Sequence, residues 1–214
     1  MDTMPSFDAA MDAMPLAAIL RGVAPEEAAA VAGDLVEAGF AIIEVPLNSP
    51  RPLDSIAAIA WRHGDRALVG TGTVRTPEEV RAVRAAAGRL VVMPHGDPAV
   101  IAAAKSQAMA VVPGVATPTE AFAALDRGAD ALTLFPAESL PPAAVKAMRA
   151  VLPPATRLLP VGGISVESMA GYWRAGAAGF GIGSTLYAPE KPQDSVAADA
   201  RRFAEAMRGL RGLG

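Results

Sequence analysis

The sequence predicts one α/β domain, residues 1–214, built as a closed (β/α)8 barrel. Three observations carry this prediction. Short apolar runs rich in β-branched residues recur eight times, and an alanine-rich segment with helical periodicity follows each run. The runs begin roughly 20 to 26 residues apart, which is about the length of a strand, a helix and two loops. The runs are also apolar along nearly their whole length, as are parallel strands covered by helices.

The expected strands, in order, are 17–21, 41–47, 67–73, 90–94, 110–114, 131–136, 157–162 and 179–183. Residues 1–14 precede the first strand and form an N-terminal extension or a helix that caps the bottom of the barrel. Residues 192–209 form the last helix. A doubly wound open sheet is the alternative, but Leu20-Arg21-Gly22-Val23 lacks the glycine-rich phosphate turn expected after its first strand.

Helix boundaries between the strands carry their own signals. Thr76-Pro77-Glu78-Glu79 and Thr117-Pro118-Thr119-Glu120 each place threonine at the N-cap, proline at the first helical position and glutamate where it closes a capping box. Glycines that allow a left-handed residue follow four expected helix ends: Gly39, Gly88, Gly128 and Gly176. The alternation of strand and helix is therefore marked at both ends of most units.

Composition limits the classes of function. Nineteen basic residues stand against 22 acidic ones, for a net charge of −3, so we expect neither nucleic acid nor a membrane surface as partner. The absence of cysteine excludes disulfides and thiolate chemistry, and two histidines cannot form a histidine-rich metal centre. We expect no cofactor and no bound metal, although a carboxylate-bound ion is not excluded. No apolar run approaches the ~20 residues of a membrane span, and the acidic N-terminus is unlike a secretory signal, so we expect a cytoplasmic protein.

In such a barrel the active site lies at the carboxyl ends of the strands, so residues there are candidates by position. The polar and glycine residues at these ends are Arg21, Glu44, Asn48, Thr71, Thr73, His95, Thr117, Thr133, Gly162-Gly163 and Gly183-Ser184. His95 either lines the pocket or takes part in catalysis.

Glu44 stands between apolar neighbours in an expected strand. A carboxylate there loses hydration, and its pKa should rise toward neutrality, which suits a general acid or base. The structural alternative is a carboxylate paired with Arg21. Arg21 could instead bind a carboxylate or phosphate of the substrate.

Two glycine-rich turns follow the last two strands, at Val161-Gly162-Gly163 and at Gly183-Ser184. Backbone N–H groups can approach a phosphate closely at such turns, and the loops after strands seven and eight of these barrels often bind one. The alternative is two tight turns without a ligand. The pair of adjacent turns favours a phosphate site.

Seven motifs occur in order along residues 15–210: Ile19-Leu20-Arg21-Gly22, Ile43-Glu44-Val45-Pro46-Leu47-Asn48-Ser49-Pro50, Gly70-Thr71-Gly72-Thr73-Val74, Val112-Pro113-Gly114, Thr119-Glu120-Ala121-Phe122, Leu134-Phe135-Pro136 and Val161-Gly162-Gly163. With them the chain resembles the family of 2-keto-3-deoxy-6-phosphogluconate and 2-keto-3-deoxy-6-phosphogalactonate aldolases. The segment 45–50 and Val161 are similar to the phosphogalactonate branch.

The resemblance implies a homotrimer that cleaves a phosphorylated keto sugar acid into pyruvate and glyceraldehyde 3-phosphate through a Schiff base. It implies that Glu44 shuttles protons and that Arg21 and Thr73 bind substrate. It also implies that Gly162, Gly163, Gly183 and Ser184 form the phosphate-binding turns. Further candidates for the pocket wall are Asn48, Thr71, Pro94, His95, Pro113, Phe135 and Val161.

One position departs from the resemblance. Family members carry the Schiff-base lysine in the sixth strand, where this chain has Thr133. Threonine cannot form an iminium, so we expect the lyase to be impaired or inactive, with a rate loss on the order of 10⁴ to 10⁶. The chain has three lysines against 16 arginines, and Lys105, Lys146 and Lys191 all lie outside the expected strands.

Two other functions fit the same residues. The chain could be a non-catalytic binder of phosphorylated sugar acids. It could also be a lysine-free enzyme that enolises its substrate with Glu44, with or without a divalent metal.

Overall fold

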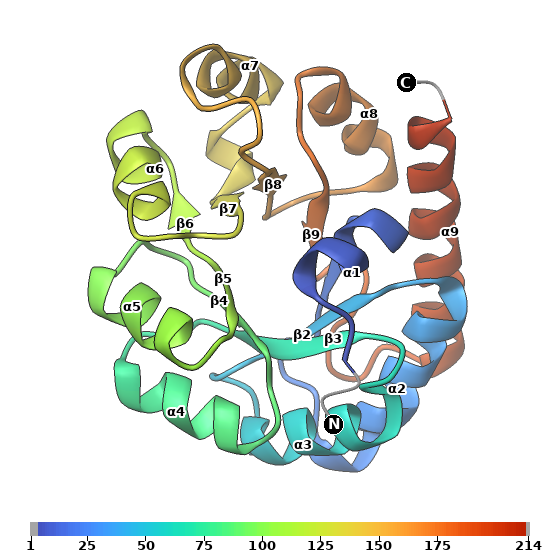
Figure 1. The fold of residues 1–214 in the computed structure, drawn as a ribbon. Helices are drawn as coiled ribbons and strands as arrows, with labels where there is room; N and C mark the ends of the chain where they lie inside the picture. Colours follow the sequence, from blue (N-terminus) through green and yellow to red (C-terminus); the bar gives the residue numbers. More distant parts are fainter. Residues whose placement is uncertain (1–3, 213–214) are drawn as a thin grey trace.

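The computed structural model describes residues 4–212, in which parallel strands are surrounded by helices (Figure 1). Residues 1–3 of the expected N-terminal segment 1–14 lie outside the described residues. The strands are β1 (Leu16–Ile19), β2 (Ile42–Pro46), β3 (Leu68–Gly72), β4 (Leu90–Val92), β5 (Ala110–Val112), β6 (Gly114–Val115), β7 (Leu132–Leu134), β8 (Leu158–Pro160) and β9 (Phe180–Ile182). The helices are α1 (Phe7–Ala13), α2 (Pro25–Ala38), α3 (Pro52–His63), α4 (Pro77–Ala85), α5 (Pro98–Ser106), α6 (Pro118–Leu125), the 3-10 helix η1 (Ala137–Ser139), α7 (Pro142–Val151), α8 (Val166–Arg174) and α9 (Gln193–Arg211).

The prediction of a closed eight-stranded barrel is wrong. The strands form a curled six-stranded parallel sheet, in the order β5-β4-β3-β2-β1-β9, and a separate three-stranded parallel sheet, β6-β7-β8. Proline is one physical reason, because Pro113 has no N–H to donate and divides the expected strand 110–114 into β5 and β6. At the other boundary, β8 ends at Pro160, and an isolated bridge between Val161 and Gly181 stands where a continuous ladder was expected.

The helix boundaries follow the predicted signals closely. The hydroxyls of Thr76 and Thr117 each accept the N–H of the glutamate three residues on, and that glutamate accepts the N–H of the threonine. Gly39 ends α2 in the left-handed conformation. The prediction for Gly88 is wrong, because the left-handed residue after α4 is Ala87.

Helix α1 lies across the centre of the ring of helices (Figure 1). Its Phe7, Ala10 and Met11 are buried in one cluster with residues at the amino ends of strands, among them Ala41, Leu68, Leu90, Ala131 and Leu159. An ion pair between Asp8 and Arg157 fastens the same helix at its rim. The amino ends of the strands are therefore covered, and the opposite ends are left to form a site.

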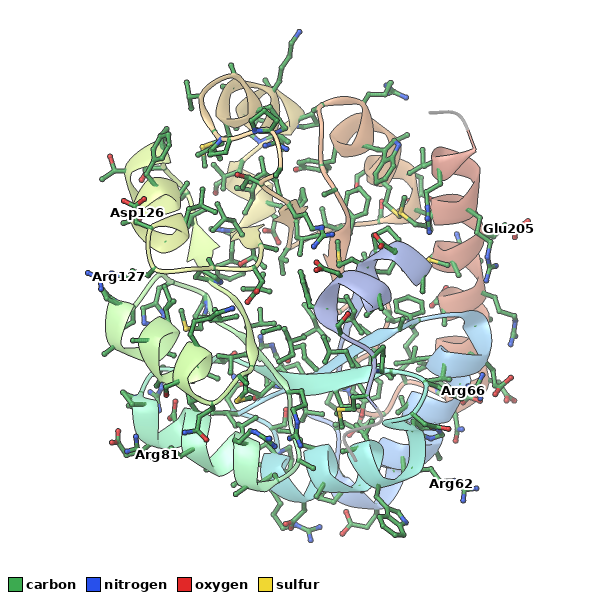
Figure 2. All side chains as sticks on the ribbon, viewed as in Figure 1. Arg62, Arg66, Arg81, Asp126, Arg127 and Glu205 are labelled. Carbon is green, nitrogen blue, oxygen red and sulfur yellow. The ribbon has the colours of Figure 1, made fainter. Side chains whose placement is uncertain are left out.

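A larger apolar cluster fills the space between the strands and the surrounding helices. Side chains that face away from it, such as Arg62, Arg81 and Glu205, project from the outer surface (Figure 2). Within residues 4–212, no helix combines the length and the apolar character that crossing a bilayer requires.

Candidate active site

Glu44 is a buried carboxylate at the centre of the six-stranded sheet. Strand β2 pairs with β1 and β3 on either side, so each of its five residues is buried. The Glu44 side chain is 3% exposed, and its Oε2 has no hydrogen-bond partner among the described residues. An unpartnered carboxyl oxygen at such a position is energetically costly, and such groups are typical of active sites.

Burial raises the pKa of Glu44 to about 8, and the positive charge of Arg21 opposes that rise. The ion pairs between described residues do not include one that joins these two side chains. Glu44 is therefore mainly protonated at pH 7, and a small change in its surroundings suffices for it to release or take up a proton.

Arg21 lies at the carboxyl end of β1 and donates a hydrogen bond to Asn48 Oδ1 at 2.6 Å. The N–H of the next residue, Gly22, donates to Ser49 Oγ at 2.9 Å. These contacts tie the loop after β1 to the loop after β2. They hold the guanidinium at the rim above Glu44, where it is exposed and can meet an anionic ligand.

A small cavity of about 50 Å³ brings both predicted catalytic residues together. Glu44 and Thr133 line its floor from β2 and β7, and Arg21 reaches it from the end of β1. The predicted residues Thr73, Pro94, Phe135 and Val161 also line it, together with Ile19, Gly72, Val92 and Met93. Thr133 is 4% exposed, so a side chain at this position meets a ligand only inside the cavity.

A larger cleft of about 420 Å³ adjoins this cavity through the shared residues Arg21, Phe135 and Val161. The two predicted glycine-rich turns line it, Gly162-Gly163 after β8 and Gly183-Ser184 after β9. Gly162 and Gly163 have φ of +109° and +61°, a conformation that side chains disfavour and that lets backbone N–H groups approach a ligand.

Hydrogen bonds hold the two turns in place. The Thr185 hydroxyl donates to Ile164 C=O at 2.8 Å, which links the turn after β9 to the turn after β8. Lys191 Nζ donates to the carbonyls of Thr185 and Leu186 at 3.1 and 2.8 Å. The two turns are therefore held by Thr185, which lines the cleft, and by Lys191, which lies outside it.

Other sequence-predicted residues lie outside the two cavities. The Thr71 hydroxyl is buried and donates to Val45 C=O at 2.9 Å within the sheet. Pro113 accepts the N–H of Thr133 at 2.9 Å, so it supports that residue through the backbone. His95 is exposed in the loop after β4 and lines neither cavity.

Sequence reasoning missed two residues that lie against the predicted site residues in the folded structure. Gly72 faces the Glu44 carboxylate, and Glu138 reaches the turn of Gly162 and Gly163 from η1. For Gly72, the alternating glycine and threonine of Gly70-Thr71-Gly72-Thr73 was a signal that the sequence offered. No spacing pattern in the sequence pointed to Glu138.

Comparison with known proteins identifies the family of this chain. The model of the family described as "KDPG and KHG aldolase" matches residues 7–198. This chain belongs to the KDPG and KHG aldolase family.

Individual members of this aldolase family are similar over nearly the whole chain. The 2-dehydro-3-deoxy-6-phosphogalactonate aldolase of Escherichia coli K12 is 45% identical over 195 residues, which cover 91% of this chain and 95% of that protein. One chain of a cube-shaped, porous cage designed by fusing symmetric oligomeric domains superimposes on this chain with a TM-score of 0.92 at 44% identity. The match covers 94% of this chain and 74% of the cage chain. A KDPG aldolase from Legionella pneumophila, solved with pyruvate captured as a covalent carbinolamine, gives a TM-score of 0.77 at 26% identity, over 94% of this chain and 96% of that one.

The lysines of this aldolase-family chain lie away from the cavity of Glu44 and Thr133. Lys105 pairs with Asp130, with an Nζ–Oδ2 distance of 2.9 Å, and Lys191 pairs with Asp199 at 2.7 Å. Lys146 is exposed on α7. In residues 4–212, no lysine lines the cavity that holds Glu44 and Thr133, and no group of three or more His, Asp or Glu side chains is placed to hold a metal ion.

Proposed function

We propose that this aldolase-family chain binds 2-dehydro-3-deoxy-6-phosphogalactonate and that Thr133 leaves its Schiff-base lyase reaction impaired or absent. One observation carries the proposal: a small cavity with Glu44 and Thr133 opens beside a glycine-lined cleft, as a ligand with a keto acid at one end and a phosphate at the other requires. The 45% identity to an E. coli enzyme of that name supports the choice of ligand.

Each end of the ligand has a chemical counterpart in the site. We assign the phosphate to the turns of Gly162-Gly163 and Gly183-Ser184, whose backbone N–H groups suit an anion. We assign the keto acid to the cavity, with Arg21 on its carboxylate and Thr73 beside it. Glu44, with a pKa of about 8, would exchange protons with the carbon atoms that react.

The missing element is an amine. In the Legionella relative, pyruvate was captured as a carbinolamine, which forms when an amine nitrogen adds to the keto carbon. Loss of water from that adduct gives an iminium, which accepts the electron pair released when the carbon–carbon bond breaks. A threonine hydroxyl cannot form an iminium, so cleavage in this chain lacks its electron sink.

Reductive trapping tests this proposal. The chain is incubated with pyruvate and borohydride, and intact mass shows whether one reduced pyruvate is attached. We expect no adduct on the wild type and one adduct on Thr133→Lys. Arg62→Lys, on the outer surface (Figure 2), is the control for unspecific lysine labelling. An adduct on the wild type, or none on a folded Thr133→Lys, contradicts the proposal.

A non-catalytic binder is a second candidate, favoured by Thr133 together with glycine turns that line the cleft, two of whose glycines have positive φ. It predicts that the phosphorylated acid raises the melting temperature of the wild type and that Thr133→Lys gains no lyase activity. Appearance of pyruvate and glyceraldehyde 3-phosphate with Thr133→Lys contradicts it.

A lysine-free enolising enzyme is a third candidate, favoured by the unpartnered Oε2 of Glu44. It predicts that the methyl protons of pyruvate exchange with deuterium in the presence of the wild type but not of Glu44→Gln. Measurements with and without EDTA show whether a divalent metal contributes. Absence of exchange under both conditions contradicts this candidate.

The proposal includes the assembly and the setting of the protein. We place residues 1–214 in a single domain that acts as a homotrimer in the cytoplasm, with α1 of the N-terminal segment covering the amino ends of the strands. The cage built from symmetric oligomeric domains supports an oligomer, because one of its chains is 44% identical to this one. Light scattering of the purified chain tests the trimer directly.

A further inference from the structure

Glu138 places a carboxylate on the turn that we assign to phosphate. A Cβ on Gly162 would collide with Glu138 Oε2, and a Cβ on Gly163 would lie 3.1 Å from Oε1. The same carboxylate lines the larger cleft together with Arg21, Gly183 and Ser184. A negative side chain therefore lies within the space where a negative ligand group would bind.

The backbone that carries Glu138 is fixed. Ala137 N–H donates to Val161 C=O at 2.8 Å, and the buried Tyr172 hydroxyl donates to Ala137 C=O at 2.9 Å. These bonds fasten η1 to the end of β8 and to α8. Consequently the Glu138 side chain starts from a constant position beside the turn.

The carboxylate itself is not fixed in this way. Glu138 is exposed, and the ion pairs and side-chain hydrogen bonds of residues 4–212 do not include its carboxylate. Rotation about its side-chain bonds can move the charge from the turn into solvent, and a ligand in the turn would restrict the rotamers left to it. The side chain can thus occupy the turn or vacate it.

We infer that Glu138 is a specificity-determining residue, whose carboxylate must leave the Gly162-Gly163 turn before a phosphate group can bind there. This inference rests on the proposed function, because it takes the turn as the phosphate site. The like charges of the carboxylate and a phosphate dianion repel strongly at such separations. Glu138 therefore weakens the binding of any ligand that offers a phosphate alone.

A ligand held at both ends displaces Glu138 at the same cost but gains binding energy elsewhere. The keto-acid end contributes its own contacts in the cavity of Arg21 and Glu44, and that contribution offsets the displacement of Glu138. Inorganic phosphate has no such second contact. Glu138 would thus lower the affinity for both kinds of ligand by a similar factor, and only a ligand with the second contact would still bind tightly.

Calorimetric titration of the full chain with inorganic phosphate tests the inference. We expect Glu138→Gln to bind inorganic phosphate roughly tenfold more tightly than the wild type, the effect of removing one nearby like charge. Glu205→Gln makes the same change of net charge on the outer surface of α9 (Figure 2) and should bind phosphate as the wild type does. Pyruvate, which lacks a phosphate, should bind equally to all three proteins.

Three results of these titrations would overturn the inference about Glu138. Equal phosphate affinity of the wild type and Glu138→Gln, or absence of binding to both, overturns the inference. Equal gains in Glu138→Gln and Glu205→Gln also overturn it, because the effect is then general electrostatics. The proposed function fails separately, if the phosphorylated keto acid stabilises neither the wild type nor Glu138→Gln against thermal unfolding.

Discussion

The carboxylate of Glu44 and the backbone of Gly72 are in such close contact that a Cβ on residue 72 would lie 2.5 Å from both carboxylate oxygens. Gly72 therefore provides the space that the buried acid occupies. We expect Gly72→Ala to destabilise the fold by about 1–3 kcal/mol, because either the carboxylate or the strand must move. Urea unfolding measures this change in free energy.

Gly209 is the matched control for that substitution. It lies within α9, and a Cβ there would have no atom within 4 Å. Gly209→Ala should raise stability by up to about 1 kcal/mol, since alanine favours the helix. Equal effects of the two substitutions would contradict the role given to Gly72.

Glu44 should make stability depend on pH. Its pKa rises from 4.5 to about 8 on folding, so between these values the folded protein holds a proton that the unfolded chain has released. Stability is thus greatest below pH 4.5 for this group and falls as pH rises toward 8, by up to roughly 5 kcal/mol. Urea unfolding from pH 5 to 9 follows the loss.

Glu44→Gln isolates this contribution, because an amide does not titrate. We expect the variant to lose the decline assigned to Glu44, and so to exceed the wild type in stability most clearly at about pH 9. Parallel curves for the two proteins across the range would show that Glu44 is ionised in the folded state.

Thr71 and Thr73 are two residues apart and should differ in role. Thr71→Val removes a buried hydroxyl that donates to Val45 C=O, so stability should fall by about 1 kcal/mol while ligand affinity is unchanged. Thr73 has φ of +62°, so Thr73→Gly relieves strain, should change stability by less than about 1 kcal/mol and should weaken ligand binding. Unfolding and titration with the phosphorylated keto acid separate the two effects.

Lys191 should act on the cleft from outside. Lys191→Met removes the donor to Thr185 and Leu186 and the partner of Asp199, so we expect a loss of about 1–3 kcal/mol and severalfold weaker phosphate binding. Lys146→Met, on the exposed face of α7, is the control and should change neither property. Thermal unfolding with and without phosphate measures both.

The local structure followed well from sequence, because its causes are local. Each expected strand overlaps an observed one, and the capping boxes of Thr76 and Thr117 form as their sequence signals predict. Closure of the sheet did not follow. It depends on whether distant strands complete a ladder, and the proline at 113 stops one without changing the apolar pattern that marks a strand.

For the candidate site, too, local position was predictable from sequence and long-range contacts were not. Position at strand ends was enough to predict that Arg21, Glu44 and Thr133 line one cavity and that the two glycine turns line the adjoining cleft, while the roles of these residues stay predictions. Thr71 shares that position, but its hydroxyl is satisfied by a backbone carbonyl that no sequence pattern reveals. Glu138 was missed because its side chain reaches across from a short 3-10 helix, where periodicity gives no guidance.

The backbone at Thr133 is held on both sides of β7, by the carbonyl of Pro113 and by pairing with Gly114 and Leu159. None of these contacts depends on the side chain. The backbone contacts that position residue 133 therefore do not depend on the identity of its side chain. A lysine at this position would keep these backbone contacts and would bring a buried amine into the cavity, so the strand geometry and the chemistry of the site are set by different parts of the same residue.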